Sequence, residues 1–147
     1  MKAVIQRVSS SKVTINQKAT KQAGEGLVIF LGIIAADTKA QADFLAEKIV
    51  NLRIFDDKND QMNLSLLDIC GSALVISNFT LGANCRKGRR PYFEFAAKPD
   101  VAENLYNYFV ERISQIEKIN IVTGDFGAHM DIIAENNGPV TIILDTQ

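Results

Sequence analysis

The sequence contains few of the residues that enzymes use for covalent or metal chemistry. Its 147 residues include one histidine, two cysteines, three prolines and no tryptophan. Cys70 and Cys85 form no C-x-x-C pair, and with one histidine they match no usual zinc-ligand spacing. His129 falls on the more polar side of an alternating segment. A surface position is therefore a simpler interpretation of this histidine than a catalytic role. We therefore expect no metal ion, no cofactor and two free thiols.

The sequence also lacks a large excess of charge of either sign and any long apolar run. The chain has 16 basic and 17 acidic residues, for a net charge of −1, so a surface that binds nucleic acid over its whole area is not expected. A local basic patch remains possible. No apolar run approaches the roughly 20 residues of a membrane helix, and no secretory signal pattern follows Met1. We expect a protein without a membrane segment and with a cytoplasmic location.

Hydrophobic periodicity predicts an α+β fold in one domain over residues 1–147. Helical spacing of apolar residues occurs at 37–52, where Thr38 and Gln41 form a capping box, and at 101–116. The apolar run at 26–34 suits a strand buried on both faces. Further strands are expected at 3–5, 13–15, 52–55, 72–79, 119–122, 130–134 and 140–144, with a hairpin turn at residues 9–11. We expect a mostly antiparallel or mixed sheet that closes toward a barrel, flanked by two helices.

Two segments contain the candidate functional residues. The first, SNFTLGANCRKGRRPYF at 77–93, has the hydroxyls of Ser77 and Thr80 near the end of an apolar strand, where turn chemistry would also explain them. It continues into a basic loop, defined here as residues 86–90, whose four cations are Arg86, Lys87, Arg89 and Arg90. A solvated loop explains these cations, but their density in a chain of net charge −1 favours contact with phosphates.

The second segment is NNGPVT at 136–141. Pro139 has no backbone N–H to give to a sheet, and Gly138 tolerates a positive φ or a very close neighbour. A hairpin turn is the simplest interpretation of these residues.

Seven short motifs in register resemble the D-aminoacyl-tRNA deacylase family over essentially the whole chain. They are QRV at 6–8, LRIF at 52–55, MNLSLLD at 62–68, SNFTL at 77–81, KGRRPYF at 87–93, TGDFGAHM at 123–130 and NNGPVT at 136–141. The resemblance implies hydrolysis of the ester that joins a D-amino acid to the 3′-terminal ribose of tRNA. It also implies a homodimer with its sites at the subunit interface.

The resemblance also implies roles for particular residues. The pocket strand of the family corresponds to Ser77, Asn78, Phe79 and Thr80, and further pocket positions correspond to Phe126 and Met130. Gly138 and Pro139 correspond to a pair with a cis peptide bond that reaches into the pocket of the other subunit, and Arg7 to the arginine that supports this pair. The chain departs from the family pattern at Asn78, Arg89, Tyr92 and Asn137, where Gln, Asn, Ser and Asp are usual.

These residues suit the implied reaction. An aminoacyl ester is already activated, so the protein needs to orient it, stabilise the carbonyl oxygen and admit water. Backbone N–H groups of Phe79 and Thr80 could stabilise that oxygen. Gly138 and Pro139, called here the chiral gate, would exclude an L side chain by shape, and a glycyl ester would pass the same test.

Two other functions remain open. A non-catalytic RNA-binding module would use the basic loop, with Tyr92 or Phe93 for base stacking. An ordinary esterase would use Ser77 or Thr80 as its nucleophile, although no base is evident beside either hydroxyl.

Overall fold

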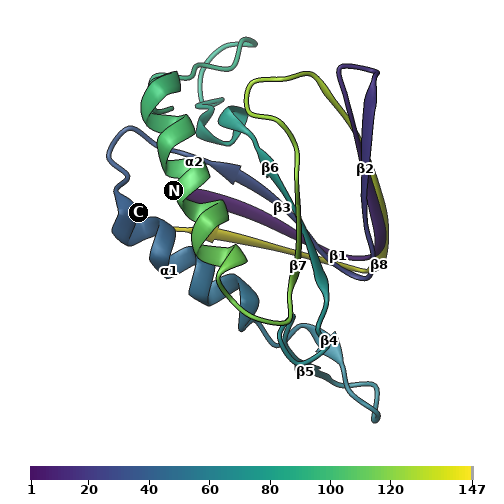
Figure 1. Cartoon of the computed structure of the whole chain (residues 1–147). Helices are drawn as coiled ribbons and strands as arrows, with labels where there is room; N and C mark the ends of the chain where they lie inside the picture. Colours follow the sequence, from purple (N-terminus) through teal and green to yellow (C-terminus); the bar gives the residue numbers. More distant parts are fainter. Residues whose placement is uncertain (147) are drawn as a thin grey trace.

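The computed structural model describes residues 1–146, which form a curved six-stranded sheet, a two-stranded hairpin and two α-helices (Figure 1). The large sheet contains β1 (Lys2–Ile15), β2 (Ala19–Ala23), β3 (Gly26–Gly32), β6 (Ser72–Ser77), β7 (Asn120–Thr123) and β8 (Met130–Asp145). The hairpin consists of β4 (Phe55–Asp56) and β5 (Met62–Leu64). The helices are α1 (Lys39–Val50) and α2 (Pro99–Ser114), and a short 3-10 turn, η1 (Phe79–Gly82), follows β6.

The sheet is mixed and nearly closed. Its order is β2-β1-β3-β6-β7, and β8 pairs with β1. The pairs that involve β1 are antiparallel, whereas β3–β6 and β6–β7 are parallel. Across the remaining gap, the Lys21 ammonium of β2 donates to the Thr123 carbonyl of β7 at 2.9 Å and pairs with Asp125 at 3.3 Å. This architecture, with its two flanking helices, confirms the predicted α+β fold class.

Two hydrophobic cores lie on opposite faces of the sheet. The helices cover one face, where Leu45 of α1 and Phe109 of α2 are fully buried. The smaller core lies within the curve of the sheet and consists of Val8, Val13, Ile15, Ala23, Val28, Leu74 and Ile76. Because Ile29 packs in the first core and Val28 in the second, β3 is buried on both faces, as its apolar run predicted.

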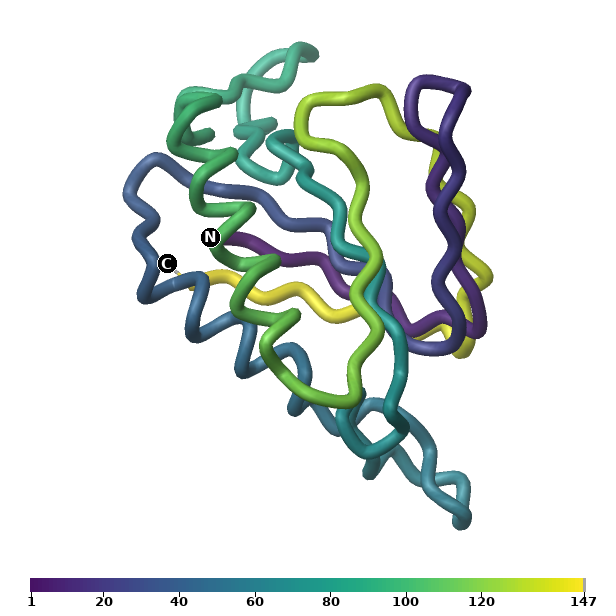
Figure 2. The backbone as a smooth tube through the Cα atoms, viewed as in Figure 1, coloured from purple at the N-terminus to yellow at the C-terminus, as the bar shows by residue number. Residues whose placement is uncertain are grey.

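Both helices form where the periodicity places them. Thr38 caps α1, and the reciprocal contacts of the predicted capping box with Gln41 are present. Figures 1 and 2 show the helices side by side on one face of the sheet, with both chain termini near α1. Among residues 1–146, no helix has the combined length and apolarity that crossing a bilayer requires.

The predicted hairpin at residues 9–11 is wrong. β1 continues through these serines, and its register against β8 shifts between Gln6 and Val8 and again between Val8 and Ser10. The exposed Ser9 and Ser10 therefore belong to a β-bulge, which accommodates polar residues without ending the strand. The turn occurs later, at residues 16–18, where Asn16 has a φ of 49° that asparagine tolerates well.

Residues 136–139 do not form a simple hairpin turn, in line with the family resemblance, which favours the chiral gate over that interpretation. Instead of two strands, β8 is one strand that pairs with β1 on both sides of Pro139. The register passes from Val8↔Asn136 to Gln6↔Thr141, so proline occupies an interruption in the ladder where its missing N–H removes no bond. The Gly138-Pro139 peptide bond is cis, as the family resemblance implied, and Gly138 has a φ of 143°.

Gly26 offers a test of the close contact between β3 and β6. A Cβ at this position would lie 1.9 Å from the Ser72 carbonyl oxygen, and the φ of Gly26 is 150°. We expect Gly26→Ala to lower the free energy of unfolding in urea by about 3 kcal/mol or more. The control is Gly24→Ala, whose Cβ would meet Ser72 Oγ at 3.8 Å, and which should change stability by less than about 1 kcal/mol. Equal losses in the two variants would contradict this account.

Candidate active site

A cavity of about 570 Å³ opens where β6 ends, within the usual size range for small-molecule sites. Most of its lining is apolar, and Ser77 and Asn78 supply its polar side chains. The lining residues come from four parts of the chain: Leu31, Ile33, Ser77, Asn78, Phe79, Phe93, Ala96, Ala97, Pro99, Ala102, Phe126, Gly127, Ala128 and Met130. Five of the residues that the family resemblance implied, namely Ser77, Asn78, Phe79, Phe126 and Met130, therefore meet at one cavity.

The chain turns sharply at the mouth of this cavity. The predicted strand at 72–79 ends at Ser77, and η1 begins at Phe79. Gly32 makes the turn possible, because a Cβ there would lie 2.8 Å from Leu81 Cβ and 3.0 Å from the Asn78 carbonyl oxygen. As a result, η1 lies directly against β3, and the Phe79 side chain is 61% exposed at the mouth.

The turn gathers polar groups at the mouth. Thr80 Oγ1 donates a hydrogen bond of 2.5 Å to Asn78 Oδ1, and the Asn78 N–H donates to the Leu31 carbonyl at 2.8 Å. The N–H groups of Phe79 and Thr80 have no acceptor among residues 1–146, as expected for the first amides of a helical turn. Two backbone donors are therefore available to a bound group.

Phe79, Phe93 and Phe126 line the cavity, and each takes part in an aromatic pair. The rings of Phe79 and Phe93 lie 5.1 Å apart, and those of Tyr106 and Phe126 lie 5.9 Å apart. The buried Tyr106 hydroxyl donates to the Val75 carbonyl at 3.0 Å. Burial, and to a smaller extent the negative charge of Asp125, raises the pKa of Tyr106 to about 12. Tyr106 thus remains neutral near pH 7 and anchors the Phe126 wall.

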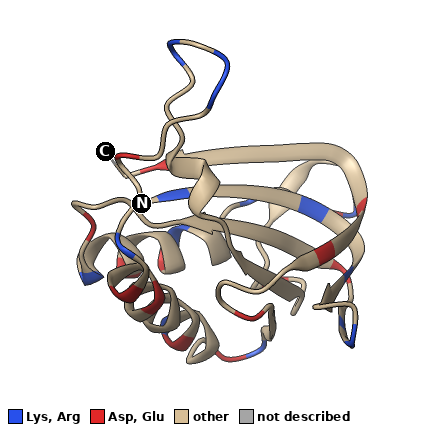
Figure 3. Ribbon diagram, turned by 90° about the horizontal axis from the view of Figure 1, so that it is seen from above, with Lys and Arg blue, Asp and Glu red and all other residues tan. Residues whose placement is uncertain are grey.

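The basic loop leads directly from one wall. Asn84 and Tyr92 exchange two backbone hydrogen bonds, of 2.7 and 3.1 Å, that close its neck. All four cations of the basic loop are exposed, and none forms an ion pair with a carboxylate of the described chain. Figure 3 shows a loop with basic residues on both arms extending away from the sheet.

The predicted chiral gate does not line this cavity. Gly138 lies eight residues after Met130 on β8, which corresponds to about 26 Å along an extended strand. Residues 136–139 are exposed. Arg7, by contrast, is only 6% exposed, and its Nε donates to the Asn137 carbonyl at 2.9 Å. One chain therefore holds the cavity and the chiral gate at separate places, with Arg7 at the gate.

The sequence did not place some of the lining residues at the cavity. Phe93 is a candidate for base stacking by its sequence, and in the structure its ring pairs with Phe79 at the cavity. Pro99 and Ala102 reach the wall because α2 begins beside it. A long-range bridge between Ile34 and Ala96 brings this segment to β3, and no local pattern predicts such a contact.

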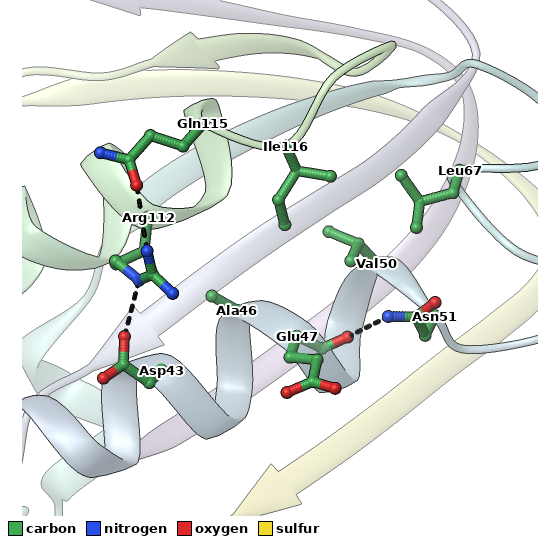
Figure 4. A pocket seen from close by; sticks show the side chains of 9 residues that line it. All are labelled: Asp43, Ala46, Glu47, Val50, Asn51, Leu67, Arg112, Gln115 and Ile116. Atoms are coloured by element: carbon green, nitrogen blue, oxygen red, sulfur yellow. Dashed lines mark hydrogen bonds and ion pairs between the residues drawn. The ribbon is translucent and has the colours of Figure 1, made fainter.

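A second cavity, of about 530 Å³, lies between α1 and α2 (Figure 4). Its polar residues bind one another: Arg112 Nε donates to Asp43 at 2.7 Å, and Arg112 Nη1 donates to Gln115 at 3.0 Å. None of the predicted site residues lines it. His129 lies between the lining residues Ala128 and Met130 but does not line the cavity, and its exposed ring has Nε2 3.4 Å from an Asp131 carboxylate oxygen. Residues 1–146 bring together no group of three histidine, cysteine or carboxylate side chains suited to a metal ion.

Comparison with known proteins identifies the family. A family model described as D-Tyr-tRNA(Tyr) deacylase matches residues 4–145. The chain belongs to the D-aminoacyl-tRNA deacylase family. This deacylase-family chain is 51% identical to the D-aminoacyl-tRNA deacylase of Clostridioides difficile (strain 630), over 99% of the chain and 97% of the relative. It is 49% identical to that of Thermosipho melanesiensis (strain DSM 12029 / CIP 104789 / BI429), over 100% and 98%.

Two solved structures resemble the deacylase-family chain. A structure titled c-Myc DNA Unwinding Element Binding Protein superposes with a TM-score of 0.92 at 36% identity, covering 100% of this chain and 99% of that one. A probable eukaryotic D-amino acid tRNA deacylase superposes with a TM-score of 0.83 at 18% identity, covering 97% of each chain, and supports the fold alone.

The raised pKa of Tyr106 predicts a pH-dependent stability difference. Tyr106→Phe removes the hydrogen bond to Val75 and should cost about 1 kcal/mol at pH 7. In the unfolded chain Tyr106 ionises near its ordinary pKa of 10, whereas in the folded protein its pKa is about 12. The contribution of the neutral hydroxyl to the free energy of unfolding is therefore complete below pH 10 and is lost as the pH rises toward about 12. The wild-type protein should therefore lose about 1.4 kcal/mol per pH unit above pH 10 relative to the variant. Urea unfolding of both proteins at pH 7, 10 and 11 measures this, and a constant difference would refute it.

Proposed function

We propose that this chain hydrolyses the ester bond of D-aminoacyl-tRNA and releases the D-amino acid and free tRNA. The observation that supports this most directly is the apolar cavity beside the free N–H groups of Phe79 and Thr80, in a chain of this family. An aminoacyl side chain would occupy the cavity, and its ester would lie at the mouth. The relatives from Clostridioides difficile and Thermosipho melanesiensis are named for the same activity.

The contacts of Thr80 favour a positioning role over a nucleophilic one. Its hydroxyl donates to the Asn78 amide oxygen, and an amide oxygen is not a base that could activate it. A water molecule would attack the ester carbonyl carbon, while the N–H groups of Phe79 and Thr80 stabilise the oxyanion. The bond to the ribose oxygen then breaks, and that oxygen takes up the proton that the attacking water loses, with the neighbouring ribose hydroxyl as the relay.

Selection of the D isomer would require a second copy of the chain. D and L side chains are equally hydrophobic, so a wall of fixed shape has to distinguish them. Gly138 and Pro139 are exposed and are anchored through Arg7, but lie far from the cavity of their own chain. In a homodimer, the gate of one subunit would enter the cavity of the other. The exposed Ile133 and Ile143 on β8, at 60% and 71%, would give this strand an apolar contact surface.

The same wall would not reject glycine. A glycyl ester carries hydrogen at both positions of its α-carbon, so neither position clashes with the chiral gate. Misacylated glycyl-tRNA is therefore a second substrate of the proposed site.

The experiment is to compare hydrolysis of D-tyrosyl-tRNA and L-tyrosyl-tRNA by the wild-type protein and by Gly138→Ala. The wild type should hydrolyse the D ester preferentially. In the variant, the added Cβ would lie 2.6 Å from the Val140 nitrogen at a φ that alanine rarely adopts, so D turnover should fall at least about tenfold. Gly24→Ala, outside the cavity lining and β8, is the control and should retain wild-type turnover.

The other outcomes of this assay separate the alternatives. Equal turnover of both isomers by the wild type would support an ordinary esterase. Binding of tRNA without turnover would support an RNA-binding module.

We further propose that the basic loop binds tRNA phosphates. The double variant Arg89→Gln, Arg90→Gln should raise KM for tRNA with kcat retained, and the slope of log KM against log salt should fall by about 2. Lys48→Gln, an exposed cation on the last turn of α1, is the control. A double variant with the wild-type KM and salt slope would show that the basic loop is only a solvated surface.

A further inference from the structure

The guanidinium of Arg7 joins two distant segments of the chain. Its Nε donates to the Asn137 carbonyl at 2.9 Å, directly before the chiral gate. Its Nη1 donates to the Ile54 carbonyl at 2.7 Å and to Asp56 Oδ2 at 3.1 Å. Ile54 and Asp56 belong to the start of the β4–β5 hairpin, which Figures 1 and 2 show at one end of the molecule.

The burial of Arg7 makes its counter-charge important. The Arg7 side chain is 7% exposed, and a buried cation is strongly destabilising unless an anion and hydrogen-bond acceptors surround it. Asp56 is the carboxylate that pairs with it, and at 45% exposure this carboxylate lies at the rim of the contact. Since a guanidinium is planar and rigid, holding Nη1 from one side also fixes the direction of Nε.

Neighbouring carboxylates on the same hairpin have other contacts. Asp57 accepts hydrogen bonds from the N–H groups of Asn59 and Gln61 and from the Asn63 amide, so it orders the turn. The exposed Asp60 has no side-chain bond among the described contacts. The hairpin thus presents Asp56 to Arg7 while Asp57 maintains the shape of the turn.

We propose that Asp56 is a positioning residue for stereospecificity. It fixes the Arg7 guanidinium, which holds the Asn137 carbonyl and thereby sets the place of Gly138. The inference rests on the proposed function, because it assumes that Gly138 and Pro139 exclude the L isomer. Through Asp56, the β4–β5 hairpin, which does not line the cavity, contributes to the selection of the D isomer.

The test uses Asp56→Asn, with Asp56→Glu as the conservative variant and Asp60→Asn as the matched control. Asp60→Asn removes the same charge from the same hairpin, and asparagine tolerates the φ of 56° at this position. We expect Asp56→Asn to lower the ratio of kcat/KM for D-tyrosyl-tRNA over L-tyrosyl-tRNA about tenfold. Asp56→Glu should recover part of the ratio, and Asp60→Asn should retain all of it. A wild-type ratio in Asp56→Asn would overturn the proposal.

A second measurement does not depend on substrate. Hydrogen exchange of the Arg7 Nε–H, followed by NMR, should be slow in the wild type and in Asp60→Asn and faster in Asp56→Asn. Unchanged exchange in Asp56→Asn would overturn the positioning role whichever ester is hydrolysed. A wild-type enzyme without D preference would instead overturn the proposed function, and with it the stereochemical role of Asp56.

Discussion

The antiparallel pairing of β1 with β8 is the constraint on which the other features depend. It runs from Lys2↔Asp145 to Ile15↔Met130, so it joins the two ends of the described chain. The register shifts around Val8 divide the pairing into two parts, which contribute to different cores. Around these shifts, the consecutive residues Arg7 and Val8 are both buried. The Arg7 guanidinium therefore faces the break in the β1–β8 ladder at Pro139, where it binds the Asn137 carbonyl. In a regular ladder, buried and exposed side chains would alternate along β1, and Arg7 and Val8 could not both be buried.

Glycines at close contacts shape the cavity. Gly32 lets η1 approach β3, and a Cβ at Gly124 would lie 2.2 Å from the Met130 sulfur. The resulting cavity is bounded by aromatic rings and small residues, with few polar side chains. Such a lining distinguishes ligands poorly by hydrogen bonding. A ligand that lacks a polar group leaves no buried polar group of the protein unpaired, so it is not rejected. Discrimination between mirror-image side chains at this cavity therefore has to come from shape, which is the task proposed for the chiral gate.

The sequence predicted features with local causes better than those with distant ones. The capping box of α1 and the apolar run of β3 depend on neighbouring residues, and both predictions are confirmed. The serines at 9–11 and the residues Asn-Asn-Gly-Pro carry genuine turn signals, but pairing along β1 and β8 overrides them. At the cavity, motifs indicated Asn78 and Met130, whereas Phe93 arrives through the bridge between Ile34 and Ala96. The contact of Asp56 with Arg7 likewise depends on tertiary structure alone.

The distribution of charge is more informative than its sum of −1. Arg7, Lys21 and Arg112 all pair with carboxylates, so their charges are compensated locally. The cations of the basic loop have no such partners among the described residues, and they retain their attraction for an external anion. The neck of this loop closes at Tyr92, and the next residue, Phe93, is already a wall of the cavity. An anionic chain bound by the basic loop would therefore lie beside the cavity mouth. A local patch of this kind would direct one end of a nucleic acid even though the net charge is only −1.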